Sequence, residues 1–183
     1  FSKKHNLKIG TIADLINYRI FNEQTVKRLE SKSVKTEHGR FNLILYKDLI
    51  FEETHIVLQK GRISKNTSTL VRVQQSNLYH DLLNVDEFGS RWSISDAMKK
   101  INRAGNGIIL LIDGDDNKEN EFKEIRASKK KRITTPNNDP RRIGIGSQIL
   151  RDLGVKKIKL MGSEVRYPSL SGFDLEVTEY IKK

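Results

Sequence analysis

The residues of this chain best placed for chemistry surround a glycine-rich segment, Gly144-Ile145-Gly146. The two glycines leave the backbone free to turn sharply, and a helix is expected from about Gly146 to Leu153. Such a turn could present backbone N–H groups to an anion at the start of the helix. Asp139 and Arg141 come just before it. On the residues alone, they could equally be a loop pair that caps and solvates the start of the helix.

Composition narrows the metal and thiol chemistry that is open to this chain. The chain has no cysteine, which removes disulfides, thiolate metal sites and thiol nucleophiles. Its four histidines show no metal-ligand spacing, so no metal site is expected. The acidic segment 113–121 has oxygen-bearing side chains spaced as in a calcium loop, but Lys118 stands where that loop needs glycine. We therefore interpret this segment as a solvated acidic turn.

Two helix–strand units are predicted from hydrophobic periodicity. After the helix that begins near Gly146, Gly154 supplies a left-handed residue, and alternation over 155–160 predicts a strand with one wet face. Upstream, apolar residues recur at helical spacing over 94–101, followed by a glycine stop at Gly105 and a buried strand at 108–111. These units place the glycine-rich segment beside a sheet.

Further strands are predicted before and after these units. Three runs have strand patterns: 41–47, 55–59 and 70–74. Short turns separate them, so an antiparallel meander is the expected assembly. A last strand is predicted over 173–181, and Thr11 is expected to cap an N-terminal helix that continues, with breaks, through Val26 and Leu29. The predicted fold class is α/β (α+β), with mixed or antiparallel strands and flanking helices.

Size and charge limit the broad class of the protein. At 183 residues, the chain is long enough for one domain with a tail. Its net charge of +11 would attract phosphate-rich partners, but no nucleic-acid recognition motif accompanies the charge, so direct nucleic-acid recognition is not expected. There is no apolar run long enough to span a membrane and no visible export signal, so a cytoplasmic location without membrane contact is expected.

Residues 139–155 resemble a late segment of GTP cyclohydrolase II, the zinc enzyme that opens the guanine ring of GTP at the start of riboflavin synthesis. That segment has the form Asp-x-Arg-x-Tyr-Gly-Ile-Gly-x-Gln-Ile-Leu-x-x-Leu-Gly-Val. Asp139 and Arg141 keep its Asp-x-Arg pair, and Ile143 stands at the position of the aromatic residue. The resemblance implies that Asp139 and Arg141 belong to the catalytic machinery, with Arg141 near the phosphates of the nucleotide.

The other chemical positions of that family are changed in this chain. The register places its three zinc cysteines at Asn77, Phe88 and Ser90, so the zinc of the family is predicted to be absent and no cofactor is expected. Its Gln-Glu-Gly-Arg loop, which helps hold GTP, is replaced by the acidic segment 113–121, and Ser128 stands at the position of a tyrosine implicated in catalysis. Two cationic positions of its nucleotide region are retained, Arg72 and Arg141.

Residues 1–19 resemble the end of 3,4-dihydroxy-2-butanone 4-phosphate synthase, which often precedes GTP cyclohydrolase II in one polypeptide. The chain begins with Phe1 rather than Met, and it is expected to be a piece of a longer protein. The resemblance divides it into a synthase tail with linker, residues 1–33, and a cyclohydrolase-like domain, residues 34–183. The implied partners are a synthase domain, attached or cognate, and a second copy of the chain in a homodimer.

Three hypotheses about function follow from the sequence. The preferred one is a catalytically degenerate cyclohydrolase-like domain with a structural or regulatory role in riboflavin biosynthesis. The alternatives are an active hydrolase of that type with an altered site, and a basic module that binds nucleotides or nucleic acid. With Arg72, Arg141 and the glycine segment retained, the preferred hypothesis predicts that phosphate or a nucleotide binds with a dissociation constant of about 1 mM or weaker.

Overall fold

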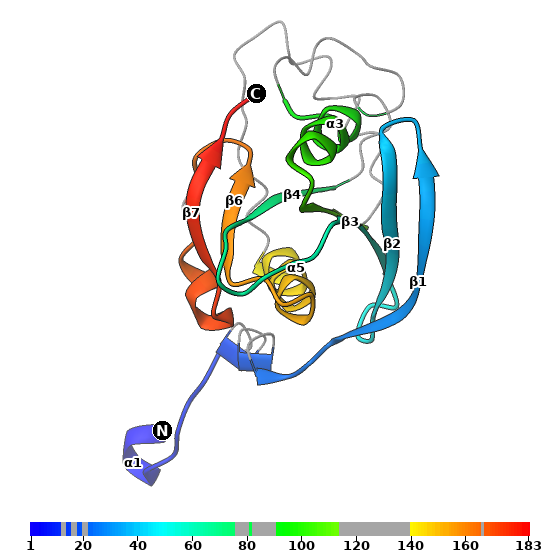
Figure 1. The fold of residues 1–183 in the computed structure, drawn as a ribbon. Coiled ribbons are helices and arrows are strands. Elements are labelled where there is room, and N and C mark those ends of the chain that lie inside the picture. The colour runs from blue at the N-terminus through cyan, green and yellow to red at the C-terminus, as the bar shows by residue number, and fades with distance from the viewer. Residues whose placement is uncertain are drawn as a thin grey trace, which may run out of the picture.

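A seven-stranded mixed sheet organises the part of the chain that the computed structural model describes (Figure 1). The described residues are 1–11, 14–15, 18–19, 22–75, 81, 91–113, 140–165 and 167–183. Their elements, in chain order, are α1 (Ser2–His5), β1 (Val26–Thr36), β2 (Gly39–Asp48), β3 (Thr54–Lys60), β4 (Thr69–Gln75), α3 (Ile94–Ala104), β5 (Gly107–Ile112), α5 (Pro140–Asp152), β6 (Lys157–Met161), η3 (Pro168–Phe173) and β7 (Glu176–Ile181).

The strands lie in the order β1-β2-β3-β5-β4-β6-β7. The pairings from β1 to β5 are antiparallel, and those from β5 to β7 are parallel. The strands predicted at 41–47, 55–59 and 70–74 are confirmed as β2, β3 and β4, and the mixed α/β class is confirmed too. The expected meander is wrong, because β5 lies between β3 and β4. The apolar strand β5 is buried on both faces, and a strand of that kind is stable only inside a sheet.

The helices α3 and α5 lie on opposite faces of this sheet (Figure 1). A hydrophobic core lies under each of them. The side chains of β5 alternate between them. Ile108 and Leu110 pack with residues of α5, whereas Ile109 packs with residues of α3. Because the period of a strand is two residues, this alternation also tells which residues of the neighbouring strands face α5 and which face α3.

The predicted helix–strand units are confirmed as α3 with β5 and α5 with β6. Ser93 caps α3 by accepting a hydrogen bond from the backbone N–H of Asp96 at 3.1 Å, and Gly105 ends the helix with φ +79°. Gly154 follows α5 with φ +81°, as predicted. At 11 and 13 residues, α3 and α5 are the longest helices described, and none of the described helices is long and apolar enough to cross a membrane.

The chain before the sheet matches its prediction only in part. Thr11 is confirmed as a cap: its Oγ1 accepts from the N–H of Asp14 at 3.0 Å, and the Asp14 carboxylate accepts from the Thr11 N–H at 3.2 Å. A helix reaching Val26 and Leu29 is wrong, because both residues belong to β1. Val26 pairs with Asp48 of β2 and is 2% exposed, so tertiary burial overrides the helical spacing. The strand β1 also continues through residues 33 and 34, the boundary expected between the synthase tail (1–33) and the cyclohydrolase-like domain (34–183).

Candidate functional site

The helix that carries Arg141 begins earlier than the sequence predicted. α5 starts at Pro140, so the sharp turn expected at Gly144 and Gly146 is wrong, and both glycines lie inside the helix. Proline is well tolerated in the first turn, where its missing N–H removes no helical hydrogen bond. Gly146 permits close packing, because a Cβ there would lie 3.2 Å from Cδ1 of Ile112. Contact between α5 and β5 thus overrides the low helix propensity of glycine, and no anion-binding turn forms at these residues.

Arg141, in the first turn of α5, is held by the turn between β2 and β3. Its Nη2 donates to Oε2 of Glu53 at 2.5 Å. Its guanidinium carbon lies 3.4 Å from the centroid of the Phe51 ring. The two charged side chains are 29% and 24% exposed, so water screens the ion pair only in part. Arg141 therefore has an anionic partner and a stacked aromatic ring within its own chain.

Asp48 fixes the conformation of this β2–β3 turn. Its side chain is buried, and Oδ1 accepts hydrogen bonds from the backbone N–H groups of Ile50 at 2.7 Å and Phe51 at 3.3 Å. The backbone N–H of Asp48 donates to the carbonyl of Glu53 at 2.9 Å and closes the turn. A side-chain carboxylate that accepts from the N–H groups two and three residues later is a common way to stabilise a tight turn. Phe51 and Glu53 are thereby presented to α5.

A second contact ties the same turn to α5. Oε1 of Gln148, a buried residue of α5, accepts from the backbone N–H of Thr25 at 2.8 Å. The carbonyl of Thr25 accepts in turn from the N–H of Leu49 at 2.8 Å. The turn is thus braced against α5 from Gln148 as well as from Arg141. The position of the turn relative to the helix is therefore set by the hydrogen bond between the buried residues Thr25 and Gln148 and by the partly exposed pair of Glu53 with Arg141.

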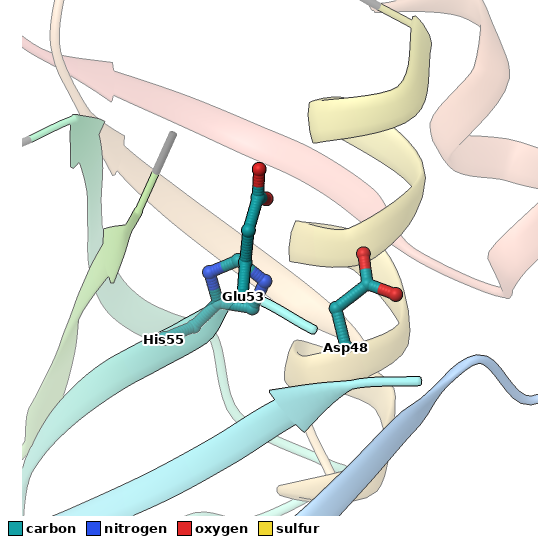
Figure 2. A group of neighbouring side chains, drawn as sticks. All are labelled: Asp48, Glu53 and His55. Carbon is teal, nitrogen blue, oxygen red and sulfur yellow. The ribbon is translucent and has the colours of Figure 1, made fainter. Parts of the chain in front are cut away.

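His55 lies beside this turn, at the start of β3, with the carboxylates of Asp48 and Glu53 close by (Figure 2). One potential ligand atom of each residue lies within 4.8 Å of the other two. Nδ1 of His55 accepts a hydrogen bond from the backbone N–H of Asp113 at 3.1 Å, so the proton of the neutral ring is on Nε2. Nε2 has no hydrogen-bond partner within the described ranges.

Burial determines the charge of His55. The side chain is fully buried, and this burial lowers its pKa below the ordinary value of 6.5, although the charges of Asp48, Glu53 and Asp113 act to raise it. His55 is therefore neutral at pH 7. The site thus combines a neutral imidazole, two adjacent carboxylates and one guanidinium, which suits metal or proton binding better than it suits phosphate binding.

Arg72, the other retained cationic position, is bound by groups of its own chain. Its Nη1 donates to the carbonyl of Met161 at 2.8 Å, its Nη2 to that of Trp92 at 3.1 Å and its Nε to Oε1 of Gln74 at 2.8 Å. Burial lowers the pKa of Arg72 to about 10, so it stays charged at pH 7. Arg72 alternates with Val71, which packs on the α5 face, and it therefore faces α3. Arg72 and Arg141 lie on opposite faces of the sheet.

The chain matches the family model of GTP cyclohydrolase II over residues 27–182. The chain belongs to this family. It is 43% identical over 187 residues to 3,4-dihydroxy-2-butanone 4-phosphate synthase of Pseudomonas aeruginosa, which covers 99% of this chain and 50% of that protein. It is 36% identical over 193 residues to riboflavin biosynthesis protein RibBA of Aquifex aeolicus, with coverage of 99% and 48%.

A solved structure shows the same fold. The crystal structure of RibBX, a two-domain 3,4-dihydroxy-2-butanone 4-phosphate synthase from A. baumannii, matches this chain with a TM-score of 0.63 and 37% identity over 100% of this chain and 48% of that one. This GTP cyclohydrolase II-type chain thus spans about half the length of the curated relatives that it matches. The family resemblance read from the sequence is confirmed, together with the relation to synthase proteins of riboflavin biosynthesis.

The residues of this chain do not fit the zinc that the GTP cyclohydrolase II resemblance implies. That metal is held by three cysteine thiolates, and this chain has no cysteine. Asparagine and serine are poor zinc ligands, and phenylalanine is none. Several positions expected to carry family chemistry lie outside the described residues: Asn77, Phe88, Ser90, 114–121, Ser128 and Asp139. The catalytic role expected of Asp139 therefore stays a prediction.

Three residues of the site were missed by sequence reasoning: Asp48, Glu53 and His55. One signal was present, because Glu53 and His55 are two residues apart at the start of a predicted strand and so point to the same face. The contribution of Asp48 depends on the pairing of β2 with β3, which sets Tyr46 opposite His55. This pairing of β2 with β3 could not be predicted from the sequence. The structure brings Arg141 to this group and places Arg72 elsewhere.

Proposed function

We propose that this chain is a catalytically degenerate GTP cyclohydrolase II domain with a structural or regulatory role in a riboflavin-biosynthesis protein. The observation that carries the proposal is the engagement of Arg141 by Glu53 and Phe51. In the family resemblance, this arginine lies near the phosphates of the nucleotide. Here its side chain already has an anionic partner, and a nucleotide would have to displace that partner before it could bind.

The charge of Glu53 opposes such a displacement. Two unit charges about 4 Å apart interact by about 4 kcal/mol at the effective dielectric of a protein surface. A phosphate approaching Arg141 would meet the Glu53 carboxylate with a repulsion of that order unless the carboxylate moved away. Burial of Asp48 and its bonds to Ile50 and Phe51 hold the backbone of the turn, so the carboxylate could move away only by rotation of the Glu53 side chain, which breaks its bond to Arg141. The site therefore favours the internal ion pair over a bound triphosphate.

Loss of the thiolate zinc site supports the same proposal. In a zinc hydrolase the ion activates a water molecule and polarises the group that is attacked, which contributes several kcal/mol to transition-state stabilisation. A chain without cysteine cannot build the family's site. Residues that hold the fold together, in contrast, make structural contacts. Arg72 joins β4 to β6 and to the segment before α3 through its hydrogen bonds. A preserved scaffold without the reactive groups is suited to support another domain.

The proposed partners are a 3,4-dihydroxy-2-butanone 4-phosphate synthase domain in the same polypeptide and a second copy of the protein in a homodimer. Relatives about twice the length of this chain carry the synthase name, which supports the first partner. Under this proposal the domain stabilises the synthase domain or its dimer. Any nucleotide or phosphate is bound weakly, with a dissociation constant of about 1 mM or more.

The test compares the full-length protein with a version that ends before β1 and lacks residues 26–183. Synthase turnover, melting temperature and oligomeric state are measured for both. The full-length Glu52→Gln variant serves as a control that removes an exposed charge from the β2–β3 turn but leaves the domain in place. We expect the shortened protein to lose synthase activity, stability or dimerisation, and the control to keep all three. If the shortened protein matches the full-length one in every measurement, the domain has neither a structural nor a regulatory role, and the proposal is wrong.

A further inference from the structure

An unpartnered nitrogen faces two carboxylates at the end of the β2–β3 hairpin. Nδ1 of His55 is occupied by the backbone N–H of Asp113, so Nε2 is the nitrogen available to Asp48 and Glu53. Nε2 has no hydrogen-bond partner among the described groups, and His55 is 0% exposed. A buried polar atom without a partner costs free energy and points to a missing ion or ligand. Figure 2 shows the three side chains gathered at one place, next to α5.

We propose that Asp48, Glu53 and His55 form a binding site for a divalent transition-metal ion of the zinc class. One imidazole nitrogen and two carboxylate oxygens are donors that zinc accepts at distances of about 2.0–2.2 Å. Tetrahedral coordination at that distance separates neighbouring donors by about 3.4 Å. The three donors here lie within 4.8 Å of one another, so a modest closure completes the site. Glu53, with a long side chain that is 24% exposed, supplies this movement.

Register and burial hold two of the three ligands in place. Asp48 and His55 lie on adjacent antiparallel strands, whose pairing is fixed by Tyr46 opposite His55 and Lys47 opposite Thr54. Both side chains face α5, as does Tyr46 in the core beneath that helix. No thiolate takes part, so this site is distinct from the family's zinc site.

Binding through Nε2 requires a shift of one proton. In the ion-free state the ring proton is on Nε2, because Nδ1 accepts from the Asp113 N–H. When the ion binds, the ring is in its other neutral tautomer, with the proton on Nδ1, and the Asp113 N–H turns away. Under this proposal the carboxylate of Asp113, the residue whose backbone contacts the ring in the ion-free chain, accepts from Nδ1–H. A carboxylate that orients a metal-bound imidazole in this way is common at zinc sites. No net proton is gained or lost.

The ion competes with Arg141 for Glu53. Because Oε2 of Glu53 is bonded to Arg141 in the ion-free chain, coordination by Glu53 breaks that ion pair. Removal of the guanidinium should therefore strengthen metal binding, whereas removal of the carboxylate should weaken it. The site has three protein donors and an open position, so it binds more weakly than closed four-ligand sites. Dialysis against a chelator should empty it. The proposed site departs from the expectation, drawn from the histidine spacing, that the chain has no metal site.

The experiment titrates Zn²⁺ alone into the untagged 183-residue chain after dialysis against a chelator. Calorimetry gives the stoichiometry, and nitrogen NMR of the imidazole rings identifies the ligating nitrogen. We expect one ion per chain and a shift of the His55 Nε2 resonance. Glu53→Gln and His55→Gln should each weaken binding by more than about tenfold, and Asp113→Asn should weaken it by about tenfold or more. Arg141→Gln should strengthen it.

A matched control is provided by His38, whose Nε2 lies 2.9 Å from Glu37 in a second histidine–carboxylate pair. His38→Gln should leave the affinity unchanged. Circular dichroism shows whether each variant is folded. If His55→Gln does not fold, the test depends on Glu53→Gln, whose side chain is partly exposed. The proposal is overturned if the chain binds no Zn²⁺, if Glu53→Gln binds as tightly as the original chain, or if His38→Gln removes the binding.

Discussion

Replacement of Glu53 by glutamine should release Arg141 and raise the affinity of the chain for phosphate groups. The substitution keeps the shape of the side chain but removes the charge that pairs with the guanidinium at 2.5 Å. Arg141 would retain its contact with the Phe51 ring, which has no charge to compete with an anion. An incoming phosphate would then approach Arg141 without the charge of Glu53.

The size of this effect follows from the exposure of the pair. Fully exposed ion pairs contribute about 0.2–1 kcal/mol, while disruption of a buried pair costs about 3–5 kcal/mol. At 29% and 24% exposure, Arg141 and Glu53 lie between these cases, and after allowance for solvent screening we assign about 1–2 kcal/mol. This corresponds to a change of about 5- to 30-fold in affinity. From a starting dissociation constant of about 1 mM, GTP should therefore bind no tighter than roughly 30 µM.

Isothermal titration of GTP and of inorganic phosphate into each variant measures the change directly. Glu52→Gln is the matched control, since it removes the same charge one residue earlier from an exposed side chain. We expect the control to behave like the original chain and Glu53→Gln to bind more tightly by the stated factor. Equal affinities in Glu53→Gln and the original chain would refute the idea that Glu53 blocks Arg141. Micromolar binding of GTP to the original chain, lost in Arg141→Ala, would refute the degenerate site altogether.

Three further predictions concern the stability of the scaffold. Tyr46→Phe should lower the free energy of unfolding by about 1–2 kcal/mol in urea titrations, because the buried hydroxyl donates to Oδ2 of Asp152 at 2.6 Å. Gly107→Ala should cost more than about 2 kcal/mol in the same assay, since φ is +153° and a Cβ would lie 2.8 Å from the carbonyl oxygen of Leu70. Burial lowers the pKa of His55 from 6.5, so the unfolded chain binds the extra proton first, and stability should fall as pH drops below about 6.5. That loss should be smaller in His55→Gln, and a similar loss in both proteins would contradict the role given to His55.

Local structure was predictable from the sequence wherever one periodicity dominated. The helix at α3 could be read because its apolar positions recur at helical spacing and Gly105 ends it. The strands β2, β3 and β4 could be read for the same kind of reason. Their arrangement could not, because the order of strands depends on which one buries both faces, and that place belongs to β5, which comes later in the chain.

The two largest errors have a common physical cause. Gly144 and Gly146 favour a turn by local propensity, and the spacing of Val26 and Leu29 favours a helix. Tertiary contacts decide both segments, because Gly146 packs against Ile112 and Val26 is buried where β1 pairs with β2. The candidate site also depends on contacts between residues far apart in the sequence. Arg141 was identified through the family resemblance, but its partner Glu53 lies 88 residues away in the chain, and no local pattern connects them.

The central claim, that this domain no longer opens GTP, is tested most directly by a turnover assay. The chain, supplied with zinc, is incubated with GTP beside an active GTP cyclohydrolase II and a no-enzyme blank, and the formamidopyrimidine product and its deformylated form are measured. The active enzyme should produce them, while this chain should not exceed the blank, since it lacks the thiolates and its Arg141 is paired with Glu53. Product that rises in proportion to this chain and disappears in Arg141→Ala would contradict the account.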